Sequence, residues 1–110
     1  MRRYVAFDLE TTGLSPETDQ MIEIGAVKIQ DQKIIAKYNC IIRPEVPVSD
    51  FFIQLTGITR KMLQNGIPLR TGVEGFLAFS EGFPVLGHNL MFDYSFMKTA
   101  ANALKKPFEK

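Results

Sequence analysis

Two carboxylates near the start of the chain have a spacing that could support chemistry. Asp8 and Glu10 belong to the stretch that follows the apolar run 4–6, and this run is typical of a buried strand. Side chains alternate along a strand, so both acids should point to the same face. At roughly 5–6 Å and an effective dielectric constant near 20, they repel each other by about 3 kcal/mol. A hard divalent cation such as Mg²⁺ or Mn²⁺ would relieve this repulsion, and so would solvation at the end of the strand. The spacing alone leaves both interpretations open.

A third carboxylate, Asp93, falls in the first turn of a helix expected over residues 90–104. Asn89 is the expected N-cap of this helix and lies four residues before Asp93, on the same side. An acid in the first turn complements the helix dipole by about 0.3–1 kcal/mol. Asp93 therefore has a sufficient structural explanation, and a metal-binding role is the alternative.

Composition and size limit the possible functions. A chain of 110 residues is long enough for one domain that buries roughly 60–70% of its unfolded surface. The net charge of +1 provides no general basic field, so any nucleic-acid site must be local. Cys40 is the single cysteine, and we expect a small strand hydrophobe there. No apolar run approaches the ~20 residues of a membrane span. We expect a single domain over residues 1–110 in the cytoplasm, with no membrane partner.

The order of the expected elements is typical of an α/β fold. Strands are expected over residues 4–9, 21–29 and 33–42, with a turn at 31–32. The second of these is apolar on both faces, which predicts an internal strand. Short helices over 50–55 and 60–64, a helix over 72–81, a strand over 84–87 and the helix over 90–104 should follow. The pattern predicts a hairpin first and a parallel strand later.

Three stretches, in order, resemble motifs of the DEDD, or DnaQ-like, 3′–5′ exonuclease superfamily. Residues 7–13 resemble its first motif, and residues 87–93 resemble its second. Residues 55–59, Leu-Thr-Gly-Ile-Thr, resemble the loop before the family's first short helix. That loop is most similar to the proofreading domain within Gram-positive-type polymerase III and to exonuclease domains attached to helicases. A single Asp-x-Glu would be weak evidence, but three motifs in order are specific.

The resemblance implies a ribonuclease H-like mixed sheet with flanking helices and a two-metal site. In the family, four acids hold two divalent metals, Mg²⁺ or Mn²⁺, for in-line displacement at phosphorus. Asp8, Glu10 and Asp93 match three of these acids and are therefore the expected catalytic and metal-binding residues. By the same resemblance Asp8 bridges both metals, Glu10 also positions the attacking water, and Asp93 binds the second metal. The expected substrate is the 3′ end of single-stranded DNA, with RNA not distinguished, and the expected partners are a DNA polymerase or a helicase.

The resemblance also implies contacts with the terminal nucleotide. The matching positions are Thr11, Thr12, Leu14, Leu55, Thr56, Ile58, His88 and Asn89. For Leu55 and Ile58, core packing is an equally good interpretation. Phe92 and Phe96 are expected in the core. His88 does not correspond to the family's catalytic histidine, and we expect it to have a structural or orienting role.

The family's third motif, a His or Tyr followed by the fourth Asp, has no counterpart after Asp93, where Glu109 is the only acid. The expectation is an incomplete exonuclease domain: a fragment, a short paralogue or a chain completed in trans. Self-association through the uncovered apolar surface is a further expectation. Two functions remain, a 3′–5′ exonuclease and a non-catalytic nucleic-acid-binding or assembly module of the same fold.

Overall fold

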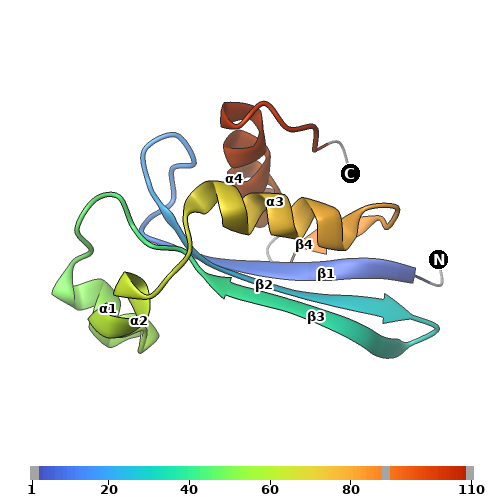
Figure 1. The fold of residues 1–110 in the computed structure, drawn as a ribbon, viewed down its shortest axis with the longest axis horizontal. Coiled ribbons are helices and arrows are strands. Elements are labelled where there is room, and N and C mark those ends of the chain that lie inside the picture. Colours follow the sequence, from blue (N-terminus) through green and yellow to red (C-terminus); the bar gives the residue numbers. More distant parts are fainter. Residues whose placement is uncertain (1–2, 88–89, 109–110) are drawn as a thin grey trace.

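The computed structural model describes residues 3–87 and 90–108 and shows a mixed four-stranded sheet (Figure 1). β1 (Arg3–Thr11) pairs antiparallel with β2 (Met21–Gln30) and parallel with β4 (Val85–Gly87). β2 also pairs antiparallel with β3 (Lys33–Ile41). The strand order β3-β2-β1-β4 confirms the initial hairpin, the later parallel strand and the internal position of the second strand.

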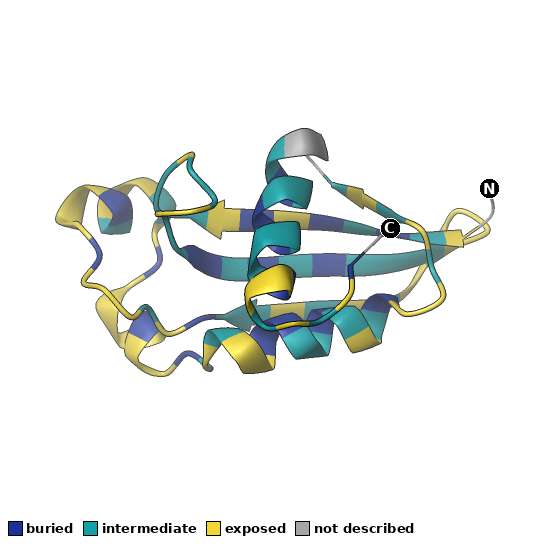
Figure 2. Ribbon diagram, turned by 90° about the horizontal axis from the view of Figure 1, so that it is seen from above, coloured by how far each residue is buried: buried dark blue, intermediate teal, exposed yellow. Residues whose placement is uncertain are grey.

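Two helices cover one face of the sheet. α3 (Leu69–Ser80) packs on β2 and β3, while α4 (Leu90–Ala103) packs on β1 and β4 and crosses over the sheet (Figure 2). Alternation along β1 directs Phe7 and Leu9 into a buried core with Phe76 and Met97. The ring of Phe76 lies 5.0 Å from that of Phe7 and 6.1 Å from that of Phe108, measured between centroids. The segment after α4 therefore contributes to the same core.

A second, smaller apolar cluster lies under α1 (Asp50–Thr56) and α2 (Arg60–Gln64). Both helices stand beyond the end of the sheet at which β1 ends and β2 begins (Figure 1). The buried members of this cluster are Ile22, Val48, Phe52 on α1, Ile58, and Leu63 on α2. The hydroxyl of Ser49 caps α1 by accepting from the Phe52 backbone N–H at 3.1 Å. Gly57 ends α1 with φ 77°, in the left-handed region that favours glycine.

The helix expected over residues 72–81 begins earlier than predicted. Pro68 is its N-cap and α3 starts at Leu69, so Gly72 lies inside the helix, where glycine is unfavourable. The two helical glycines are there because α3 approaches β3 and the residue that follows it, Ile42, closely. A Cβ atom at Gly72 would lie 3.2 Å from the Ile42 side chain, and one at Gly75 would lie 2.3 Å from the Tyr38 hydroxyl.

Other expectations agree with the structure. The β2–β3 turn lies at Asp31 and Gln32, which have φ 52° and 70°, as a tight hairpin requires. Cys40 packs against the main core, and burial raises the pKa of its thiol. Within residues 3–87 and 90–108, no helix combines the length and apolarity that crossing a bilayer requires. Self-association stays a prediction.

Candidate active site

Asp8 and Glu10 lie on the face of the sheet opposite α3 and α4. Both side chains are exposed, whereas Phe7, which precedes Asp8, and Leu9, which lies between the two acids, are buried. The Oδ1 atom of Asp8 accepts a hydrogen bond from the Leu9 backbone N–H at 2.9 Å. The two acids thus share one face of an internal strand and are open to solvent.

A further acid, Glu23 on β2, lies directly opposite Glu10 in the antiparallel register. Its carboxylate accepts a hydrogen bond from the Asn39 side chain at 3.1 Å. Like charges at directly opposite positions of a sheet are destabilising. Although the Glu10 side chain is exposed overall, partial burial of its carboxyl group raises its pKa, and the charges of Asp8 and Glu23 raise it further. Such an arrangement is unfavourable for the fold alone, which is typical of a functional site.

Asp93 lies in the first turn of α4 and is only 1% exposed. β4 brings this turn toward β1, because Gly87 pairs with Phe7 and α4 starts shortly afterwards. In the part of the chain that the structure describes, no group of three or more His, Cys, Asp or Glu side chains is arranged to hold one metal ion. The structure therefore brings Asp8 and Glu10 together but does not join Asp93 to them in one ligand set.

Thr11 and Thr12, which were predicted to contact the substrate, use their hydroxyls to stabilise the loop that follows β1. The Oγ1 atom of Thr11 donates to the Gly13 carbonyl at 2.7 Å, and that of Thr12 accepts from the Gln20 backbone N–H at 2.8 Å. Leu14, in contrast, is 83% exposed at this loop. The two threonines shape the loop, and Leu14 is presented to solvent.

The sequence analysis did not single out Asp19 and Gln20, which fix this loop. The Asp19 carboxylate accepts from the Ser15 backbone N–H at 2.9 Å and leaves no room for a Cβ atom at Gly13. The side-chain amide of Gln20 donates to the Val46 carbonyl at 2.9 Å. The loop is thereby tied to the segment that leads into α1. An acid four residues after Ser15 in a turn-rich stretch is the signal that could have indicated this role.

Three predicted contacts in and after α1 have different environments. Leu55 is 71% exposed, so the core-packing interpretation is wrong for this residue. Ile58 is 5% exposed in the second cluster, which agrees with core packing. The Thr56 hydroxyl donates to the Phe52 carbonyl at 2.8 Å, within the helix. His88 and Asn89, also predicted as contacts, lie outside the described residues.

The aromatic residues of α4 agree with their predicted place in the core. Phe96 is buried, and the ring of Phe92 lies 4.9 Å from it, measured between centroids. The ring of Phe96 is therefore not a candidate base platform, and Phe92 is partly buried against the same core.

A family model of the RNase T type, described as exonuclease, matches residues 5–110. The chain belongs to this exonuclease family. The PolC-type DNA polymerase III of Caldanaerobacter subterraneus is 42% identical over 101 residues, which are 92% of this chain and 7% of the polymerase. The exonuclease chain thus spans about 7% of the length of that relative.

Solved structures show the same fold. E. coli exonuclease I in complex with a 5cy-dA13 oligonucleotide superposes with a TM-score of 0.78 at 16% identity, over 93% of this chain and 24% of that chain. The nuclease domain of 3′hExo, a DEDDh family member bound to rAMP, superposes with a TM-score of 0.78 at 19% identity, over 98% of this chain and 62% of that chain. The predicted ribonuclease H-like fold and the DnaQ-like 3′–5′ exonuclease family are confirmed.

The raised pKa of Glu10 predicts that the exonuclease fold loses stability as the pH rises through that pKa. The folded chain holds this proton more tightly than the unfolded chain, in which a glutamate has a pKa of about 4.3. The contribution is complete below the unfolded pKa and is lost above the folded one. Glu10→Gln has no proton to release, so its urea midpoint relative to the wild type should increase from about pH 4 to about pH 7 without divalent cations. A difference that is the same at every pH would contradict this.

Proposed function

We propose that this chain is a 3′–5′ exonuclease domain of the proofreading type, which hydrolyses phosphodiesters at the 3′ end of single-stranded DNA. The observation that carries the proposal is the pair Asp8 and Glu10, exposed together on an internal strand with Glu23 opposite. The PolC-type relative supports association with a DNA polymerase. The oligonucleotide bound to E. coli exonuclease I supports a nucleic-acid substrate.

The exposed face of the sheet that carries Asp8 and Glu10 has the type of donor atom that a divalent cation requires. Asp8 and Glu10 offer carboxylate oxygens, which Mg²⁺ and Mn²⁺ prefer. The charges that raise the pKa of Glu10 are those that a cation would neutralise. Asp93 is proposed as a further ligand on its match to the family's second motif alone, since its side chain is buried and is not grouped with Asp8 and Glu10 among the residues that the structure describes. When bound, such cations stabilise the charge that develops at phosphorus and acidify a coordinated water.

Residues near the exposed acids would position the 3′ end of the single-stranded nucleic acid. Leu14 and Leu55 are exposed apolar side chains suited to contact a base. The loop that Thr11 and Thr12 hold in shape presents its backbone near the end of β1. Because hydrogen bonds within the loop already fix its conformation, the loop needs little reordering when the nucleic acid binds.

Nucleic-acid binding without turnover is the second candidate function. Residues 94–110 contain no aspartate and no histidine. They therefore supply no side chain that matches the general base and fourth acid of the family's third motif.

Digestion of a single strand carrying a 5′ label separates the two functions. With Mg²⁺ or Mn²⁺ we expect shortening from the 3′ end one nucleotide at a time, release of 5′-mononucleotides, and no reaction in EDTA. Binding of the same strand without shortening would favour the second function. Cleavage at internal positions would contradict both.

A further inference from the structure

An aromatic residue beside Leu55 has no role in the site described so far. Phe51 is 72% exposed in the first turn of α1, and Leu55, one turn later, is 71% exposed. Residues four apart lie on the same face of a helix. α1 thus presents two large apolar side chains side by side to solvent, while Phe52 is buried on its other side.

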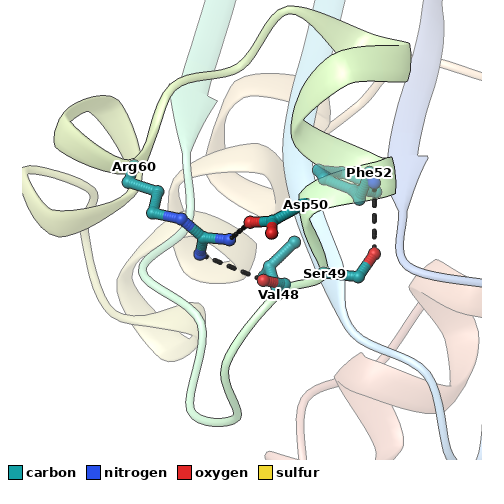
Figure 3. A network of polar contacts seen from close by, with 5 residues as sticks. All are labelled: Val48, Ser49, Asp50, Phe52 and Arg60. Carbon is teal, nitrogen blue, oxygen red and sulfur yellow. Dashed lines mark hydrogen bonds and ion pairs between the residues drawn. The ribbon is translucent and has the colours of Figure 1, made fainter.

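The helix that carries this pair is firmly held. Figure 3 shows the Arg60 guanidinium reaching back from α2 to the start of α1. It donates to the Val48 carbonyl at 3.0 Å and forms an ion pair with Asp50. Ser49 caps the same turn. Phe51 is therefore exposed on a fixed support, and a ligand that packs on it pays little to order the backbone.

The position of α1 connects Phe51 with the candidate site. A hollow of about 260 Å³ lies between the start of α1 and the loop after β1, and Thr12, Gln20, Ser49 and Phe52 are among its lining residues. That loop begins where the strand carrying Asp8 and Glu10 ends. A single-stranded nucleic acid whose 3′ end reaches Asp8 and Glu10 past this loop would have α1 beside it.

The spacing of the pair favours unpaired bases. At 1.5 Å rise per residue, Phe51 and Leu55 are about 6 Å apart along the helix axis. Neighbouring nucleotides of a duplex strand advance only about 3.4 Å. Two apolar contacts at this spacing suit bases that have separated from each other, and exposed aromatic rings are the usual platforms for such bases.

We propose that Phe51 is a base-stacking residue for single-stranded nucleic acid and holds the base next to the one that meets Leu55. The inference rests on the proposed nucleic-acid substrate and adds a specificity-determining residue, which selects single strands over duplexes.

The absence of tryptophan from the chain allows a direct test. In Phe51→Trp the indole is the sole tryptophan, and a stacked base should quench its fluorescence. Oligothymidylate is titrated in EDTA, so that no metal-dependent hydrolysis consumes it. The matched control is Ile35→Trp, at a position 53% exposed near the start of β3, at the opposite end of the sheet from α1 (Figure 1). We expect quenching in the first variant by the single strand, none by a duplex, and none in the control.

Affinity gives the second measurement. Stacking contributes about 1–3 kcal/mol per base, so Phe51→Ala should weaken binding of a labelled oligothymidylate by roughly 5- to 150-fold. Phe51→Tyr should retain the affinity, and a urea midpoint should show that both variants fold.

The outcomes separate this proposal from the exonuclease proposal. Unchanged fluorescence in Phe51→Trp, while the wild type binds and shortens the same strand, overturns the stacking role alone. Quenching without any shortening by the wild type supports stacking and favours the non-catalytic function. A wild type that binds no single strand overturns the stacking role.

Discussion

Replacing Asp8 by asparagine should abolish Mn²⁺ binding and the metal-dependent release of nucleotides. Asparagine keeps the size of the side chain and an oxygen for the Leu9 backbone N–H, which Asp8 binds at 2.9 Å. It removes the negative charge that a hard cation requires. Loss of a residue that merely supports a metal ligand costs about 10–100-fold in affinity or activity, so loss of a proposed ligand should cost at least about 100-fold. Calorimetric titration with Mn²⁺ and digestion of a labelled strand measure the two effects.

Asp31→Asn is the matched control for this substitution. Asp31 is an exposed aspartate in the β2–β3 turn with φ 52°, a conformation that asparagine also adopts. It should leave metal binding and nucleotide release unchanged. Because Asp8 and Asp31 are both exposed, each variant should keep its stability within about 0.5 kcal/mol. Equal digestion by Asp8→Asn and the wild type would identify a contaminating nuclease, and equal Mn²⁺ affinity would show that the proposed metal site is wrong.

The acidic face shows how far alternation along a strand can predict a site. The shared face of Asp8 and Glu10 follows from the two-residue period of a strand. The position of Glu23 opposite Glu10 does not, because it depends on the register between β1 and β2. That register shifts between Glu10 and Thr11, and the loop held by Asp19 sets how the chain returns. Sequence periodicity contains neither piece of information.

The region of α1 was less predictable, because neighbouring apolar residues have opposite environments. Phe51 is 72% exposed and Phe52 is 7% exposed. Likewise Leu55 is exposed and Ile58 is buried. The caps of the short helix were visible in the sequence, but the face that it buries depends on contacts with Ile22 and other residues distant in the chain. Composition alone would assign all four residues to a core.

Asp93 illustrates the same limit on α4. The sequence correctly placed it in the first turn of a helix. Its burial beside Phe96 and Met97 follows from the three- and four-residue neighbours on one helix face. The relation of that face to Asp8 depends on how the helix crosses the sheet, which is a tertiary property.

The largest loss of stability should come from Phe76→Ala. Phe76 is fully buried on α3, where it joins the β1 residue Phe7 to Phe108 after α4. Truncating a buried phenylalanine costs about 3–5 kcal/mol, because packing is lost and a cavity remains. Natural domains have about 5–15 kcal/mol in total. The variant should therefore unfold at a much lower urea concentration than the wild type, or fail to fold.

Phe51→Ala is the matched substitution at an exposed site and should change the free energy of unfolding by no more than about 0.5 kcal/mol. Phe76→Leu should fall between the two, because it keeps an apolar side chain and leaves a smaller cavity. Equal urea midpoints for the two alanine variants would mean that the core does not depend on Phe76. With the expected, unequal midpoints, the same chemical change separates the two roles of phenylalanine in this chain: at position 76 it removes stability, and at position 51 it weakens the proposed binding of single-stranded nucleic acid while the fold remains.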